Sequence, residues 1–167
     1  MKVVEAYVGL GGNIGDAFAE QQKALQHLKE SSCIDQLAVS NFYLTTPVES
    51  DSSTPFVNAV CKFKTTATPY ALLQLLQTIQ KNLGQGPKSR SEDRLIDLDL
   101  LFFGNEIVQT PELQIPHPRW KERLFVLVPL AELTDKILLL HEQIILKDIL
   151  NNFSNPHNET VLLQVRS

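Results

Sequence analysis

The most informative segment of the chain reads Asp93-Arg94-Leu95-Ile96-Asp97-Leu98-Asp99-Leu100-Leu101-Phe102-Phe103. It is a near-continuous apolar run, which is typical of a buried β-strand. Because side chains alternate between the two faces of a strand, Asp97 and Asp99 share one face and the intervening aliphatic residues share the other. The segment therefore predicts a core strand that carries two carboxylates side by side.

This carboxylate pair is a candidate metal site. Burying two like charges together is costly without a cation. Magnesium takes one or two carboxylates and keeps waters and substrate phosphates as its other ligands. Arg94 adds a cation suited to phosphate, and this combination is the equipment of phosphoryl transfer. The alternatives are an edge strand with a solvated polar face, or a carboxylate pair that Arg94 neutralises.

Composition favours one globular domain over residues 1–167. The chain is 43% hydrophobic and 20% charged, and its net charge of -4 argues against an electrostatic nucleic-acid binder. It contains neither a long apolar run nor the apolar core of a signal peptide, so we expect a cytoplasmic protein without a membrane span. Cys33 and Cys61 are expected to be free thiols, with one disulfide as the alternative.

The periodicity predicts a mixed order of strands and helices. Strands are expected over residues 3–10, 33–44, 56–63 and 161–165, and helices over 17–30, from Pro69 toward a stop at Gly84, near Arg119 onward, and over 146–153. A short β-ribbon is expected over residues 106–115. With the 93–103 strand, the order is β-α-β-β-α-β, the split βαβ or ferredoxin-like arrangement. It predicts an α+β fold, an antiparallel sheet with helices packed on one face, plus a C-terminal extension.

The glycine-rich segment Gly11–Asp16 follows the first predicted strand. It lacks the Lys-Ser or Lys-Thr of a P-loop, and Ile14 stands where the dinucleotide fingerprint needs its third glycine. We interpret it as a tight turn with Asp16 as the cap of the next helix, in preference to a phosphate-binding loop.

Two long polar loops, residues 45–55 and 85–93, are either connectors or lids. The second carries Lys88 and Arg90, which either face solvent or close over phosphates. After the first loop, Phe56 and Asn58 share a strand face, so an aromatic plane lies beside an amide that can both donate and accept. That pair suits the edge of a heterocycle, although a surface Phe and a structural Asn are the simpler interpretation.

Several segments, in order and at compatible spacing, resemble the 6-hydroxymethyl-7,8-dihydropterin pyrophosphokinase family of folate synthesis. They are Tyr7–Asn13, Phe42-Tyr43 with Thr45, Phe56–Ala59, Arg94–Phe102, Pro116-His117-Pro118, and Arg123 with Phe125–Leu130. The resemblance implies transfer of pyrophosphate from ATP to the hydroxymethyl oxygen of the pterin, with release of AMP.

The resemblance also implies residue roles. Asp97 and Asp99 would hold two Mg²⁺ ions, and Arg94 would contact phosphates as the third catalytic residue. The expected nucleotide-binding residues, including the two loop cations, are Gln77, Lys88, Arg90, Leu100, His117 and Arg123. The expected pterin-binding residues are Thr45, Thr46, Val48, Phe56, Asn58 and Phe125, of which the two Phe rings would sandwich the pterin. The expected partners are these two small molecules, with no nucleic acid, no membrane and a monomeric chain.

The chain departs from the family on the ATP side. Gln80 stands where the family usually has a glutamate, Gln85 stands where it has an arginine, and Ser91-Glu92-Asp93 precedes Arg94. These changes make a weak or inactive pterin- or nucleotide-binding paralogue the alternative function. Retention of both aspartates favours the enzyme, and a ferredoxin-like regulatory module ranks last because it needs no such pair.

Overall fold

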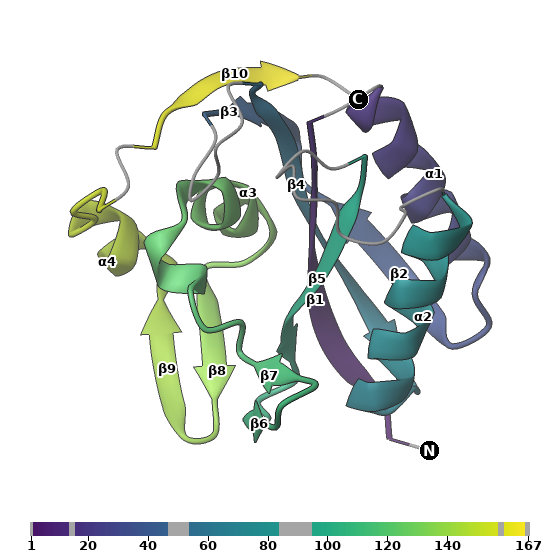
Figure 1. The fold of residues 1–167 in the computed structure, drawn as a ribbon. Coiled ribbons are helices and arrows are strands. Elements are labelled where there is room, and N and C mark those ends of the chain that lie inside the picture. Colours follow the sequence, from purple (N-terminus) through teal and green to yellow (C-terminus); the bar gives the residue numbers. More distant parts are fainter. Residues whose placement is uncertain (1, 14–15, 47–53, 84–94, 157–158, 166–167) are drawn as a thin grey trace.

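The structure, a computed structural model, describes residues 2–13, 16–46, 54–83, 95–156 and 159–165 (Figure 1). Its strands are β1 (Val4–Gly12), β2 (Ile34–Val39), β3 (Phe42–Thr45), β4 (Phe56–Thr65), β5 (Asp97–Phe103), β6 (Val108–Gln109), β7 (Gln114–Ile115), β8 (Lys136–Leu139), β9 (Glu142–Ile145) and β10 (Val161–Val165). Its helices are α1 (Ala17–Glu30), α2 (Pro69–Asn82), α3 (Leu124–Leu133) and α4 (Leu146–Asn151), with a 3₁₀ turn η1 (Trp120–Glu122).

A six-stranded sheet in the order β10-β3-β4-β1-β5 forms the centre of the molecule, and β2 pairs with β4 beside this path. Every pair in it is antiparallel. Helices α1 and α2 lie together on one face (Figure 1). The α+β, ferredoxin-like arrangement expected from the element order is therefore confirmed.

The first two helices begin where the sequence predicts. Asp16 caps α1 by accepting a hydrogen bond from the Ala19 backbone N–H at 3.0 Å. Thr68 caps α2 in the same way through Ala71, at 3.2 Å, and Pro69 occupies the first turn, where no N–H is needed. The α2 helix ends at Asn82, and the predicted stop at Gly84 lies outside the described residues.

The sequence predicted helices on one face only, but α3, the helix expected from near Arg119 onward, covers the other face of the sheet (Figure 1). Two separate apolar clusters result, one between the sheet and α1–α2 and one between the sheet and α3 with the β8–β9 hairpin. The sequence did not predict the β8–β9 hairpin, because its turn lacks the Gly or Asn that usually marks a tight turn. Leu140 takes the positive φ, 52°, that such a residue normally adopts there. The ribbon expected over residues 106–115 is present as β6 and β7.

The strand predicted over residues 33–44 is two strands. Val39 lies opposite Cys61, and Tyr43 lies opposite Asn58. The segment that joins β2 to β3 therefore contains one residue more than the part of β4 that it pairs with. Ser40 occupies the break, where its side chain accepts from the Val60 N–H at 3.0 Å. This bonding satisfies the buried backbone at the irregularity, and the hydrophobic pattern alone does not reveal it.

The helix predicted to start near Arg119 is also divided. Residues 120–122 form the 3₁₀ turn η1, Arg123 is extended with φ −119° and ψ 110°, and α3 begins at Leu124. The first two N–H groups of α3 donate to a distant carboxylate, that of Glu159, instead of to a local cap. The short C-terminal helix and the final strand are present as predicted, as α4 and β10.

No helix among the described residues is both long enough and apolar enough to cross a membrane. Cys33 and Cys61 are both free thiols, as expected. Cys61 is fully buried, and burial raises the pKa of its thiol to about 12.

We expect the two thiols to react at very different rates in the native protein. At pH 9 Cys61, whose pKa is about 12, stays protonated and is shielded by full burial, whereas Cys33 is only half-buried and open to a reagent. A disulfide reagent such as DTNB should therefore modify Cys33 first and Cys61 only after unfolding. Cys33→Ser is the control, since it should remove the fast phase. A fast phase that persists in Cys33→Ser would contradict the assignment.

Candidate active site

The two predicted metal-binding carboxylates lie on β5, the outer strand of the sheet. Asp97 is half-buried and Asp99 is exposed, whereas Leu98 and Leu100 are buried on the opposite face. The alternation predicted from the sequence is therefore present. The carboxylates themselves are more open to solvent than a core strand suggests, so water reduces their mutual repulsion and ligand oxygens can reach them.

A row of cross-strand neighbours joins this pair to the predicted pterin residues. Asp97 lies opposite Gly11 of β1, Gly11 lies opposite Asn58 of β4, and Asn58 lies opposite Tyr43 of β3. Directly opposite residues point to the same face. With strands 4.7–4.9 Å apart, the Cα atoms of Asn58 and Asp97 are about 10 Å apart across Gly11. The row lies on the α3 face, because Tyr7 and Val60, which share it, belong to the α3 cluster.

Gly11 makes this row possible. A Cβ atom built on Gly11 would lie 2.9 Å from the Asn58 side-chain oxygen, closer than such atoms approach. The glycine segment interpreted as a turn is thus partly strand, since β1 continues through Gly12 and pairs on both sides. The alternation of Gly9 and Gly11 was the sequence signal for this strand, because it leaves one face of β1 without side chains at the two positions opposite Asp99 and Asp97.

Asn58 is held in place by a buried hydroxyl. Its side-chain nitrogen donates to Thr45 Oγ1 at 2.7 Å, and the two residues are 4% and 0% exposed. Phe56 lies on the same face two residues earlier and is half-buried. The structure therefore brings together Thr45, Phe56 and Asn58, three of the predicted pterin residues.

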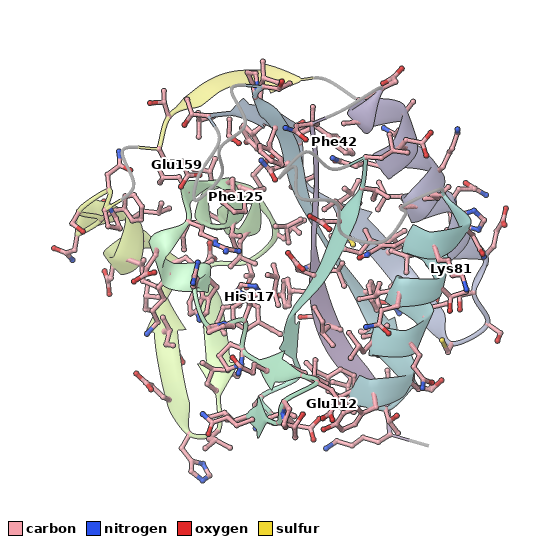
Figure 2. The ribbon with its side chains drawn as sticks, viewed as in Figure 1. Phe42, Lys81, Glu112, His117, Phe125 and Glu159 are labelled. Carbon is pink, nitrogen blue, oxygen red and sulfur yellow. The ribbon has the colours of Figure 1, made fainter. Side chains whose placement is uncertain are left out.

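The α3 side supplies an aromatic ring and basic groups. Phe125 is half-buried in the first turn of α3, and the Arg123 guanidinium carbon lies 5.3 Å from the centre of its ring. His117 lies on the same side of the sheet as Phe125 (Figure 2). Its backbone N–H donates to the Leu101 carbonyl at 3.1 Å, and its Nδ1 accepts from the Arg119 N–H at 3.3 Å. A neutral His117 ring therefore carries its proton on Nε2.

Gln80 has a structural role beside the aspartates. Its side-chain oxygen accepts a hydrogen bond from the Leu98 backbone N–H at 2.7 Å. Leu98 lies between Asp97 and Asp99, so this bond connects α2 to the strand that carries the carboxylates. The bond needs an acceptor oxygen but no charge, and the neutral amide serves as well as the glutamate that the family usually has.

The structure does not bring all of the remaining predicted site residues together with this group. Gln77 is exposed on α2, and the Leu100 side chain is 5% exposed within the α1–α2 cluster, on the other face of the sheet from the carboxylates. Arg94, Lys88, Arg90 and Val48 lie outside the described residues. Within the described part of the chain, no three His, Cys, Asp or Glu side chains form a metal-binding group. A metal ion here would depend on the aspartate pair and on ligand oxygens.

This fold and this arrangement define a class of protein. Paired carboxylates that can hold a metal ion, with basic groups over the same face, are the parts that phosphoryl transfer uses, and the aromatic rings beside them suit a flat acceptor, so the class is a phosphotransferase. The sequence model described as 7,8-dihydro-6-hydroxymethylpterin-pyrophosphokinase (HPPK) matches residues 7–135. The chain belongs to this family of enzymes, as the resemblance of its motifs implied.

Relatives agree with the family match. The 2-amino-4-hydroxy-6-hydroxymethyldihydropteridine pyrophosphokinase of Bacillus subtilis is 39% identical over 132 residues, 79% of each chain. The protein of the same name from Haemophilus influenzae is 36% identical over 143 residues, 86% of this chain and 89% of the relative.

Solved structures agree in fold. A Plasmodium falciparum HPPK-DHPS triple mutant superposes with a TM-score of 0.69 at 14% identity, over 96% of this chain and 47% of that one. A second HPPK-DHPS triple mutant has the same TM-score at 16% identity, over 99% and 49%. This chain thus spans about half of those longer proteins, and at such identity the likeness concerns the fold alone.

We expect the two strand glycines to differ in their tolerance of alanine. Gly11→Ala should lower the free energy of unfolding by about 1–3 kcal/mol, because the new methyl group meets the buried Asn58 amide. Gly9→Ala is the matched control: its Cβ would contact the Leu101 side chain at an ordinary 3.6 Å, so stability should change by under about 1 kcal/mol. Urea denaturation measures both. Equal stability losses would contradict the role of Gly11.

Proposed function

We propose that this chain transfers pyrophosphate from ATP to the hydroxymethyl group of 6-hydroxymethyl-7,8-dihydropterin and releases AMP, a step of folate biosynthesis. Family membership supports the reaction. The observation that carries its assignment to a site is the row in which Asn58 and Asp97 flank the bare backbone of Gly11. This row offers an amide to the pterin edge at one end and a carboxylate to the phosphates at the other.

In this proposal the acceptor lies across Gly11. Phe125 and Phe56 stack on the two faces of the pterin, and Asn58 bonds to its edge, with Thr45, Thr46 and Val48 completing the pocket. The Asn58 amide can bond to a flat heterocycle without rearranging, because Thr45 already orients it. With the ring edge at Asn58, the hydroxymethyl oxygen points along the row toward Asp97.

Asp97 and Asp99 would hold two magnesium ions, which neutralise the charge of the polyphosphate when bound. The carboxylates fit this role because they share one face and are open to solvent, so phosphate and water oxygens can complete the ligand set. Arg94, His117 and Arg123 would bind phosphate oxygens, together with Lys88 and Arg90. We assign Gln77 and Leu100 to the nucleotide side, Leu100 through its backbone since its side chain is buried.

We further propose one domain over residues 1–167 that acts as a cytoplasmic monomer without nucleic acid. The net charge of -4 supports the absence of a nucleic-acid partner, and the two free thiols support a reducing compartment such as the cytoplasm. An inactive paralogue is disfavoured, because both aspartates are present and Gln80 bonds to Leu98 without needing a charge.

Loss of either carboxylate should abolish transfer. Asp97→Asn and Asp99→Asn keep the side-chain shape and remove a metal-binding charge, so AMP release from ATP with hydroxymethyl-dihydropterin should fall by about 100-fold or more. The fold should survive, since Asp97 is only half-buried and Asp99 is exposed. Asp35→Asn, a change at an exposed carboxylate on β2, is the control and should turn over normally. Normal turnover in either site variant would exclude that carboxylate from the mechanism.

Loss of the Phe125 ring should affect pterin far more than ATP. Phe125→Ala removes a stacking face worth on the order of 1 kcal/mol beyond area burial, which raises the pterin dissociation constant roughly fivefold or more. Phe125→Leu keeps apolar bulk without the ring and should show most of the same loss. Calorimetric titration with each substrate measures both constants. Equal losses for pterin and ATP would contradict the pocket.

A further inference from the structure

Glu159 is a buried carboxylate far in sequence from every predicted site residue. It is 2% exposed and lies beyond residues 7–135, the part that matches the family. Its two carboxylate oxygens accept hydrogen bonds from the backbone N–H groups of Leu124, at 2.7 Å, and Phe125, at 2.5 Å. Figure 2 shows Glu159 beside the end of α3 that carries Phe125.

These bonds replace a local helix cap. The first N–H groups of a helix have no partner within it, and this end carries a partial positive charge that favours an anion. Arg123 occupies the N-cap position of α3 but makes no side-chain capping bond. Glu159 therefore fixes the backbone from which the Phe125 ring projects.

Glu159 is itself fixed by Asn155. The Asn155 side chain accepts from the Glu159 N–H at 2.8 Å and donates to the Glu159 carbonyl at 3.0 Å. Asn155 has a positive φ of 51°, a conformation that Asn tolerates better than most residues. The carboxylate is thus presented on a constrained backbone.

The next residue, Thr160, bonds to another residue of the proposed pterin pocket. The Thr160 N–H donates to Thr46 Oγ1 at 2.8 Å, and the Thr46 N–H donates to the Thr160 carbonyl at 3.0 Å. Val161 then starts β10 opposite Thr45. Two consecutive residues, Glu159 and Thr160, therefore hold one pterin-pocket residue each, Phe125 and Thr46.

We propose that Glu159 is a positioning residue for the pterin substrate: it sets the Phe125 ring against the Thr46 side of the pocket. The inference rests on the proposed function, which assigns Phe125 and Thr46 to the pterin. It predicts an effect on pterin affinity, because the two backbone N–H groups that Glu159 holds belong to Phe125 and to the residue before it.

The other end of α3 has its own anchors. Glu132 accepts from the Asn41 side chain at 2.6 Å and from the Tyr43 hydroxyl at 2.6 Å, and Lys62 Nζ donates to the Leu133 carbonyl at 2.9 Å. A change at Glu159 should therefore loosen the first turn without releasing the helix. Glu132 also provides a matched control, a carboxylate that anchors the same helix away from Phe125.

The test compares Glu159→Gln with Glu132→Gln in the full chain. Glutamine keeps the shape but has one acceptor oxygen, so one α3 N–H then faces an amide NH₂. Fluorescence titration with hydroxymethyl-dihydropterin, in the presence of a non-hydrolysable ATP analogue, should give a dissociation constant about tenfold higher for Glu159→Gln. The constant for the analogue alone should stay within about twofold. Glu132→Gln should lower the melting temperature and leave pterin affinity unchanged.

Asn155→Gly keeps the experiment decisive if Glu159→Gln fails to fold. Glycine accepts the positive φ and removes the clamp on Glu159, so pterin affinity should fall by a smaller factor, about threefold. Equal effects of the Glu159 and Glu132 variants on pterin affinity, or unchanged affinity in a folded Glu159→Gln or Asn155→Gly, would overturn the inference. If Phe125→Ala weakens pterin binding and Glu159→Gln does not, only the positioning role fails. If Phe125→Ala has no effect, the pocket itself is wrong.

Discussion

The antiparallel pairing of β1 with both β4 and β5 is the constraint on which the rest of the structure depends. It aligns Asn58, Gly11 and Asp97 in one row, and strand alternation then places this row on the α3 face of the sheet, opposite the face that packs against α1 and α2. Gly11 has to lack a side chain because Asn58 occupies the space above it. The same pairing therefore builds the fold and spaces a heterocycle-binding amide from a phosphate-binding carboxylate.

Helix α3 closes the site face and is held by polar groups at both ends. An anion, Glu159, meets its N-terminal N–H groups, and a cation, Lys62, meets a carbonyl at its C-terminus, which is the arrangement that the helix dipole favours. Burial, and then the hydrogen bond to Glu132, raise the pKa of Tyr43 to about 12, so this phenol stays a donor even in alkaline solution near pH 10. Such bonding offsets the cost of burying polar groups next to an apolar helix.

The departures from the family take on a different meaning in this context. Gln80 removes a charge, but its amide oxygen bonds to the strand that bears the carboxylates, a role in which charge is unnecessary. The C-terminal segment beyond residue 135 does more than extend the fold, since it adds β10 to the sheet and contributes Glu159 to the α3 N-terminus. Differences among relatives in this segment are therefore expected to alter the pterin side of the site more than the nucleotide side.

By itself the sequence determined the features that depend on local pattern. These are the strand alternation of Asp97 and Asp99, the caps Asp16 and Thr68, and the ferredoxin-like order of elements, because periodicity and capping act over a few residues. Only the tertiary structure placed Gly11 between Asn58 and the carboxylates, divided the strand at Ser40, and brought Glu159 to Phe125. Each of these depends on cross-strand register or on contacts between distant residues. Glu159, for example, accepts a hydrogen bond from the backbone N–H of Phe125, 34 positions earlier in the chain.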